Sequence, residues 1–182
     1  MITLADRVFG GVSARQLAVY LPAQLAGGVL GAIAANLMLG LAPVSLSAHP
    51  RTGAGLWLSE VLATFGLVVL VFGLVRSQRA GLASFGVGAY IAAAYWWSSS
   101  TGFANPMIAV ARMLSDTFAG IAPASVPMFV LAQLLGGAVA VAAVWALFPD
   151  AARQAGDVVV PHPATTHAAD PAPGRQSLEQ SR

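Results

Sequence analysis

The sequence predicts an all-α membrane protein with four membrane-spanning helices, one complete re-entrant half-helix and one partial half-helix at the start. Hydrophobic residues make up 57% of the 182 residues and charged residues only 9%, whereas soluble domains carry about 25% charged residues. The mean hydropathy is +0.74. Apolar runs of about 20 residues, the length that crosses a bilayer, recur along the chain.

The first two spans follow a short opening segment. Residues 1–14 are partly apolar and stop at a pair of glycines. The first predicted span, residues 15–39, is rich in alanine and glycine, which let helices approach closely in lipid. The second, residues 55–75, contains Glu60. An ionisable residue inside a span is costly, so Glu60 is a candidate functional residue; the alternative is a carboxylate that stays hydrated near the interface.

Two further spans and a tail complete the chain. The third predicted span covers residues 81–101 and the fourth covers residues 124–148. Tryptophans near the ends of these spans, such as Trp97 and Trp145, suit the aromatic belt at a membrane interface. Residues 150–182 are rich in proline, alanine and polar side chains and lack periodicity, which predicts a disordered cytoplasmic tail.

Between the third and fourth spans lies an apolar segment that is too short to cross a bilayer. It opens on Asn105-Pro106. Asparagine is a favoured helix N-cap, and proline fits the first helical turn because its missing N–H costs nothing there. This pattern predicts a re-entrant half-helix over residues 105–117 that lines a watery cavity. The alternative is an interfacial loop helix that happens to start with Asn-Pro.

The arginines predict the orientation of the chain. Most fall on the side that holds both termini and the loop between the second and third spans, and that side is expected to face the cytoplasm. These arginines are Arg7, Arg15, Arg76, Arg79, Arg153, Arg175 and Arg182. Arg51 lies on the other side and Arg112 inside the half-helix. The arginines form no patch that would suit nucleic acid, and we expect a multi-pass protein of the plasma or inner membrane.

An internal repeat relates the two ends of the bundle. Residues 23–28 (AQLAGG) recur as residues 132–137 (AQLLGG), and residues 1–5 match residues 107–111. The first copy faces the cytoplasm and the second faces outside, so the repeat is inverted. Inverted repeats place a pathway at the bilayer midplane between the two halves. Chance similarity between helices rich in alanine and glycine is the alternative.

Three short motifs resemble the aquaporin and glycerol-facilitator (major intrinsic protein) family. Asn105-Pro106-Met107 resembles its second Asn-Pro-Ala box. Residues 60–65 (EVLATF) resemble the Glu-x-x-x-Thr-Phe of the first helix of a half, and residues 132–136 resemble the start of the last helix. The resemblance covers residues 1–149, which would form one aquaporin-like transmembrane domain.

The resemblance implies a channel for passive transport of water and small neutral solutes, such as glycerol or a metalloid hydroxide. It also implies a homotetramer in a lipid bilayer and no enzyme activity, cofactor or metal. A membrane enzyme would need a cluster of catalytic or metal-binding groups. The histidines at 49, 162 and 167 share no helix face, and the absence of cysteine excludes disulfides and thiolate metal sites.

The chain departs from the family in its span count, since the family has six spans and two boxes. Met1 falls where the third residue of the first box would lie. We therefore expect the coding sequence before Met1 to continue in frame through two further spans that end in Asn-Pro. The alternative is a truncated, non-conducting fragment of the family.

The expected pore differs from the family pattern at its filter. Met107 replaces the box alanine, and Ile108 stands where the family usually has an arginine; the nearest arginine is Arg112. Ala93 stands where water-selective members carry histidine and glycerol channels carry glycine. A wider, less polar constriction is therefore expected. The expected pore-lining residues are Asn105, Pro106, Met107, Ile108, Gly102 and Ala93. Glu60 is expected to support the pore loop by accepting hydrogen bonds from its backbone N–H groups.

Overall fold

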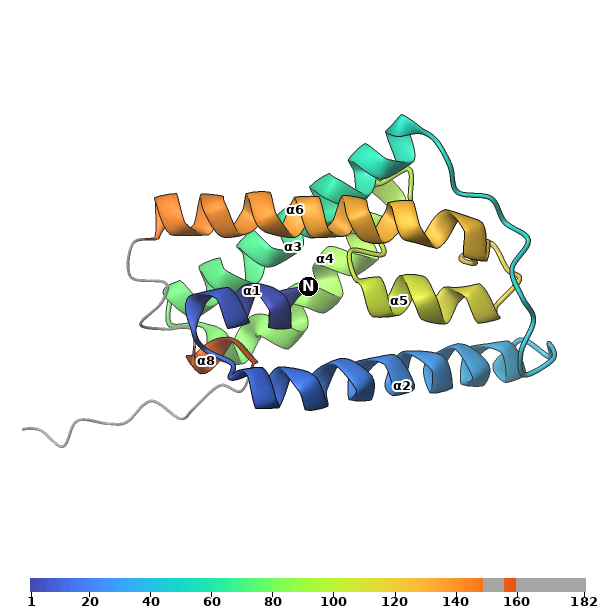
Figure 1. Ribbon diagram of the computed structural model, residues 1–182, viewed down its shortest axis with the longest axis horizontal. Helices are drawn as coiled ribbons and strands as arrows, with labels where there is room; N and C mark the ends of the chain where they lie inside the picture. The colour runs from blue at the N-terminus through green and yellow to red at the C-terminus, as the bar shows by residue number, and fades with distance from the viewer. Residues whose placement is uncertain (149–155, 160–182) are drawn as a thin grey trace, which may run out of the picture.

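The computed structural model describes residues 1–148 and 156–159, and the regular structure in these ranges is entirely helical. The α-helices are α1 (Ile2–Phe9), α2 (Ala14–Met38), α3 (Ala54–Arg76), α4 (Ala83–Trp97), α5 (Pro106–Ala111), α6 (Val126–Leu147) and α8 (Gly156–Val159). Short 3-10 turns are η1 (Ala80–Leu82), η2 (Arg112–Leu114) and η3 (Pro123–Ser125). Figure 1 shows α1 and α5 end to end between α6 and α2, with the start of the chain between them.

Three helical segments in the described part of the chain are long and apolar enough to cross a membrane: α2, α3 and the continuous segment Pro123–Leu147. The all-helical membrane fold is therefore confirmed. The expected third span, residues 81–101, is shorter than predicted. Its helix α4 has 15 residues and is about 22 Å long by the usual helical rise, with the three-residue turn η1 directly before it, whereas the hydrocarbon core is about 30 Å thick. The polar residues after Trp97 leave the helix and begin a loop, which composition alone did not separate from the span.

Capping residues explain where α1 ends and α2 begins. Gly10 has a φ of 87°, and the N–H groups of Gly10 and Gly11 donate to carbonyls of the last turn of α1. Glycine adopts this left-handed conformation without a Cβ penalty. Ser13 and Gln16 then form a capping box at the start of α2. These local signals position α1 as a short half-helix beside α2.

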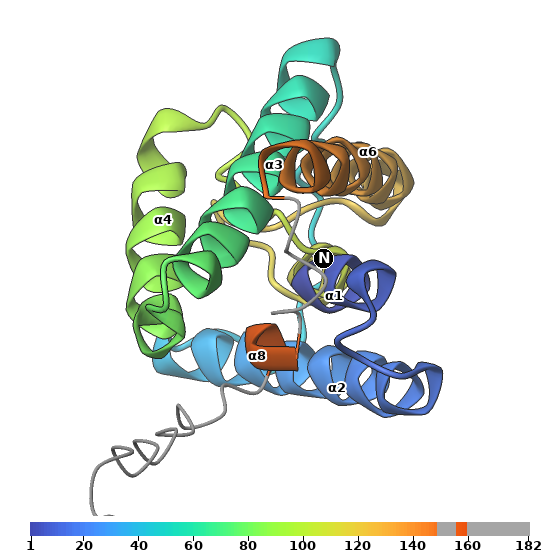
Figure 2. The ribbon, with the colours of Figure 1, turned by 90° about the vertical axis from the view of Figure 1, so that its left-hand side faces the viewer.

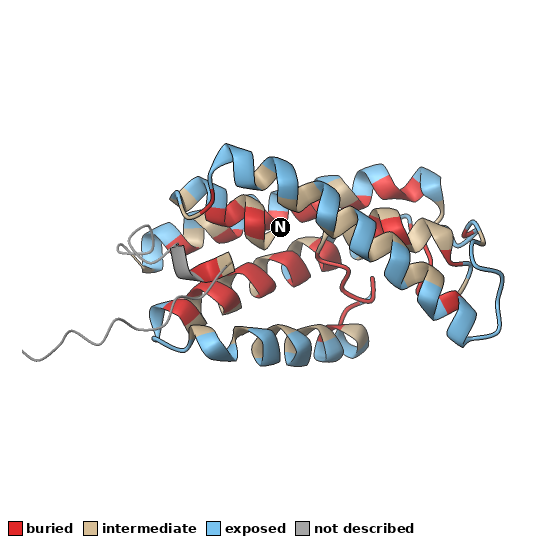
Figure 3. Cartoon of the chain, turned by 90° about the horizontal axis from the view of Figure 1, so that it is seen from below, coloured by how far each residue is buried: buried red, intermediate tan, exposed pale blue. Residues whose placement is uncertain are grey.

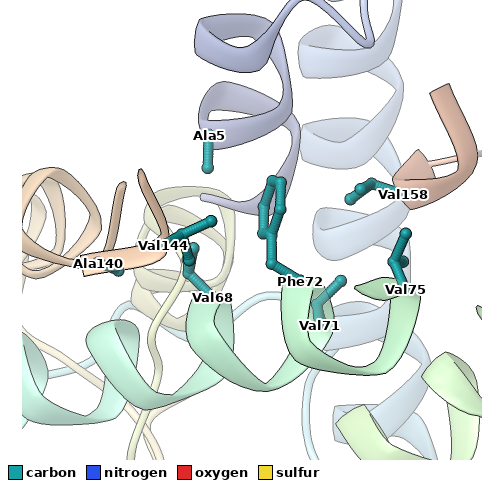
Figure 4. Close-up of a cluster of buried hydrophobic side chains, with 8 residues drawn as sticks. All are labelled: Ala5, Val68, Val71, Phe72, Val75, Ala140, Val144 and Val158. Carbon is teal, nitrogen blue, oxygen red and sulfur yellow. The ribbon is translucent and has the colours of Figure 1, made fainter. Parts of the chain in front are cut away.

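Helix α3 lies at the centre of the core and packs along α6 (Figure 2). The two backbones approach closely at Gly136, where an added Cβ would overlap the carbonyl oxygen of Val61. A cluster of buried apolar side chains joins α1, α3, α6 and α8 (Figure 4). Its members are Ala5, Val68, Val71, Phe72, Val75, Ala140, Val144 and Val158.

Most of the predicted disordered tail, residues 150–182, lies outside the described residues. Four of its residues instead form the short helix α8, which packs against α1 and α3; Figure 4 shows its Val158 near Val75 of α3. Val158 is 7% exposed and belongs to the core cluster with Phe72. The average composition of the tail is polar, which concealed the local run of three valines at positions 158–160. Over Gly156–Val159 the structure therefore has a helix where the sequence predicted disorder.

The outer helices are largely exposed. Asn36 is the buried residue of α2, and Ala94 that of α4, and most of both helices has exposed or intermediate residues in Figure 3. Large apolar side chains such as Val19, Leu30 and Met38 point outward. Apolar outward faces suit contact with lipid tails, because the helices already satisfy their backbone polar groups internally.

Candidate functional site

The residue pair Asn105-Pro106 starts α5 as an N-cap and first turn. Asn105 has extended backbone angles (φ −152°, ψ 120°), and its side-chain oxygen accepts a hydrogen bond of 3.0 Å from the N–H of Met107. Pro106 is buried in the first turn of the helix. The local geometry is the one that an Asn-Pro cap favours. The Asn105 amide is thereby held at the point where the chain turns from loop to helix.

The loop before Asn105 has an unusual backbone. Thr101, Gly102 and Ala104 all have positive φ angles, of 64°, 57° and 51°. Non-glycine residues rarely adopt this region, and each strained residue costs on the order of 1–3 kcal/mol. Gly102 has a second constraint, because an added Cβ would lie 2.7 Å from the Cβ of Ala94. Contacts from the surrounding helices must therefore hold the loop in place.

Glu60 of α3 supplies three of those contacts and also binds Gln133 of α6. Its Oε1 accepts hydrogen bonds from the N–H of Phe103 (2.9 Å) and the hydroxyl of Ser100 (2.6 Å). Its Oε2 accepts from the N–H of Ala104 (2.9 Å) and the Nε2 of Gln133 (2.6 Å). The side chain is fully buried, so the structure places Glu60 behind the loop and far from bulk water.

Gln133 and Ser100 were not singled out by the sequence analysis. Gln133 lies in the repeated AQLLGG segment, and this repeat was a signal that could have identified it. Its repeat equivalent, Gln24, donates instead to the hydroxyl of Thr3 at 2.9 Å. Gln24 thus binds a residue of α1, whereas Gln133 binds the carboxylate that holds the loop before α5.

Arg51 holds together loops at one end of the bundle, a role that the sequence analysis missed. Its Nε donates to the carbonyl of Gly120 (2.7 Å), and its two terminal nitrogens donate to those of Ser100 (2.9 Å) and Phe118 (2.8 Å). Burial lowers the pKa of Arg51 from its usual value, while the nearby Glu60 carboxylate acts in the opposite direction. An arginine remains charged in either case. The sequence signal was a single arginine in an otherwise uncharged outer loop.

Asn36, near the end of α2, holds the far end of the half-helix. Its Nδ2 donates to the carbonyls of Leu114 (2.9 Å) and Pro43 (3.1 Å), and its Oδ1 accepts from the hydroxyl of Ser115 (2.7 Å). The side chain is completely buried. The sequence offered no signal for this residue, because its partners lie in distant turns.

Three cavities meet around Asn105. The largest, of about 510 Å³, lies between α2 and α5 and includes Gln24, Ile108 and Arg112 in its lining. A second cavity of about 310 Å³ lies on the α4 side, and a third of about 230 Å³ lies where Met1 approaches Asn105. Asn105 lines all three. Three separate cavities therefore border the cap residue.

The comparisons with known proteins identify the family. The curated protein named aquaglyceroporin AqpS, from Rhizobium meliloti (strain 1021), is 43% identical to this chain over 149 residues. The chain belongs to the aquaporin and glycerol-facilitator family. The matched segment covers 81% of this chain and 64% of the relative, so the chain spans less than two thirds of that protein's length. Models of protein families gave no match, and no solved structure matched significantly.

The structure brings together only part of the filter expected for an aquaporin-family pore. Ile108 lines the two larger cavities and Gly102 lines the second. Pro106 and Met107 are absent from the linings of the three cavities. Pro106 is buried at the helix start, and Met107 is half-buried. Their contribution as pore-lining residues stays a prediction.

Ala93 lies on the side of α4 that faces away from the three cavities. It is exposed on α4 and lines none of the three cavities. Ile91 and Tyr95 line the second cavity instead. Residues four apart share a helix face, whereas Ala93, between them, points to the opposite face. Counting back from Asn105 takes no account of this rotation, and the place of Ala93 in an aquaporin-family filter stays a prediction.

The described residues contain no group of three or more His, Cys, Asp or Glu side chains that could hold a metal ion. The polar groups around the three cavities are mainly amides, hydroxyls and one guanidinium. Such groups bind oxygen-bearing solutes by hydrogen bonds.

Proposed function

We propose that this chain forms an aquaporin-family channel that passes glycerol-like neutral solutes and water, and that it is not an enzyme. The observation that carries the proposal is the cavity of about 510 Å³ along α2 and α5, together with the relationship to a protein named aquaglyceroporin. Small residues such as Gly28 and Ala32 form one wall of this cavity, and Gln24 and Asn105 add amide groups. Passive passage needs such a path and no reaction chemistry.

The proposed pore residues are Asn105, Met107, Ile108 and Gly102, with Glu60 as support of the pore loop. Amide N–H donors suit the hydroxyl oxygens of a polyol. With Ile108 at this position, the constriction of the path is wider and less polar than it would be with an arginine. This combination favours small neutral solutes larger than water, such as glycerol or a neutral metalloid hydroxide, over ions.

The proposed setting is a bilayer of the plasma or inner membrane, with both termini in the cytoplasm. Residues 1–149 form the proposed channel domain, including the partial half-helix of residues 1–14, and residues 150–182 the cytoplasmic tail. The excess of arginine on one side supports this orientation. We also propose a homotetramer with one pore in each protomer, for which exposed small residues of α2 outside the cavity linings, such as Ala23 and Ala26, offer a close-packing face.

The direct test is glycerol flux through the full chain in liposomes. An inward glycerol gradient is applied by stopped-flow mixing, and swelling is followed by light scattering. We expect swelling at least roughly threefold faster than in protein-free vesicles of the same size, because a path lined by hydrogen-bonding groups lowers the barrier to entry. Equal rates in both preparations would contradict the proposal and favour a non-conducting fragment.

Asn105→Asp tests whether the cap residue faces the solute. Aspartate is also a favoured N-cap, so it can accept the hydrogen bond from Met107 and keep the helix start. It nevertheless replaces two N–H donors with a charge in the middle of three cavities. We expect glycerol flux per protein to fall by about threefold or more. Gln78→Glu, at an exposed loop position, makes the same chemical change as a control. Unchanged flux in Asn105→Asp would count against the assignment.

A further inference from the structure

Two arginines flank the ring of Phe103 near the outer end of α5. The guanidinium carbon of Arg51 lies 5.0 Å from the ring centroid, and that of Arg112 lies 5.9 Å from it. These distances suit cation–π attraction. The two side chains differ in what their N–H groups contact, and this difference separates their roles.

The N–H groups of Arg51 are used within the protein. Three of its nitrogens donate to the carbonyls of Gly120, Ser100 and Phe118 at 2.7–2.9 Å. The residue is 6% exposed. It therefore ties the outer loops together and has little capacity left to bind a solute.

Arg112 has its N–H groups largely free. Its one hydrogen bond to the described residues is a long contact of 3.5 Å to the carbonyl of Ala119. It lines both the cavity of about 510 Å³ and the cavity of about 310 Å³, in each case beside Asn105 and Ile108. It is the one charged side chain in the linings of the three cavities that meet around Asn105. An arginine carries five N–H donors in a rigid plane, so most of them remain available to the cavity.

We propose that Arg112 is the charged selectivity residue of the pore and that Ile108, one helical turn before it, sets the width. This inference rests on the proposed channel function. Residues four apart lie on the same face of a helix, so the two side chains act at successive levels of one path. The guanidinium repels cations and donates hydrogen bonds to hydroxyl oxygens. Ile108 leaves space for a carbon skeleton. Charge exclusion and pore width are thus assigned to two separate residues.

A pore in which Arg112 excludes charge and Ile108 sets the width should pass a defined class of solute. Neutral molecules with several hydroxyl groups and a cross-section wider than water should pass, because Arg112 can replace part of their hydration at the outer level. Monovalent cations of similar size should be rejected there, because no acidic residue lines the three cavities to offset the positive charge.

The test measures glycerol swelling and cation leak on the same liposomes containing the full chain. Methylammonium and sodium are the cation probes. Arg112→Leu is expected to keep at least half of the glycerol flux while raising the cation leak about threefold or more. Arg112→Lys keeps the positive charge, so its cation leak should stay as low as that of the unmodified protein. Arg79→Leu removes one positive charge from an exposed loop outside the cavities and should leave both readouts unchanged.

Arg112→Gln provides a second variant if the leucine variant does not insert into liposomes, since it retains N–H donors without the charge. It should also raise the cation leak. Suppose that the unmodified protein passes glycerol but that neither neutral variant leaks more cations than Arg79→Leu. This result would overturn the inference about Arg112 and leave the proposed channel function standing. Absence of glycerol flux in the unmodified protein would overturn both the inference and the proposed function.

Discussion

Glu60→Leu is expected to destabilise the folded protein by about 3–5 kcal/mol, the range found when one partner of a buried charged network is removed. The change leaves four donors without an acceptor: the N–H groups of Phe103 and Ala104, the Ser100 hydroxyl and the Gln133 amide. Each unsatisfied buried group costs about 1–3 kcal/mol. The loop with positive φ angles at Thr101 and Ala104 would lose its main external support. Thermal unfolding in detergent, followed by size-exclusion chromatography, measures the effect.

Thr64→Val is the matched control for this prediction. Thr64 lies one turn further along α3 and is completely buried, and its hydroxyl has no partner among the described residues. Valine has nearly the same shape, so the control should change stability by less than about 1 kcal/mol. The stability of Glu60→Gln should lie between those of Glu60→Leu and Thr64→Val, because an amide NH2 group replaces one acceptor oxygen. Equal thermal stability of Glu60→Leu and Thr64→Val would show that Glu60 does not hold the loop.

Gly136→Ala is expected to separate α3 from α6 and to destabilise the bundle by about 1–3 kcal/mol or more. The added Cβ would overlap the Val61 carbonyl oxygen and lie 3.0 Å from both the carbonyl carbon and the Cα of Val61. These atoms belong to the backbone of α3 and cannot rotate away as a side chain could. Glu60 lies next to Val61, so the shift should also disturb the loop before Asn105. We expect both a lower unfolding temperature and a lower glycerol flux per protein.

Gly73→Ala provides the control on the partner helix. Nothing outside its own helix lies within 4 Å of a Cβ built at Gly73. Alanine has a higher helix propensity than glycine by about 1 kcal/mol, so this variant should be as stable as the parent or slightly more stable. If Gly136→Ala is as stable as Gly73→Ala, the close approach of α3 and α6 does not determine the stability of the bundle.

Several features of this protein follow from the sequence because they depend on local or compositional signals. A helical membrane fold follows from the low charge and the long apolar runs. The start of α5 follows from Asn105-Pro106, since a cap acts on N–H groups within three residues. Glu60 was identified as a candidate because an acid inside an apolar span needs partners. The partners themselves were only partly predicted: the loop N–H groups were expected, whereas Gln133 and Ser100 were not.

Other features were decided by the tertiary structure. Gly27 and Gly136 occupy equivalent positions of the repeat, yet Gly136 lies against the backbone of α3 and Gly27 has nothing within 4 Å. Likewise, Arg51 and Arg112 are alike in type, but one donates to three loop carbonyls and the other faces two cavities. The cavity-facing side of α4, which carries Ile91 and Tyr95 rather than Ala93, depends on the rotation of the helix against its neighbours. Local sequence determines where a helix begins and which residue types it offers. Which side chains meet across 40 or more residues, as in the 43-residue separation of Glu60 and Phe103, depends on how the helices pack, because burial and hydrogen-bond partners exist only once the helices are in contact.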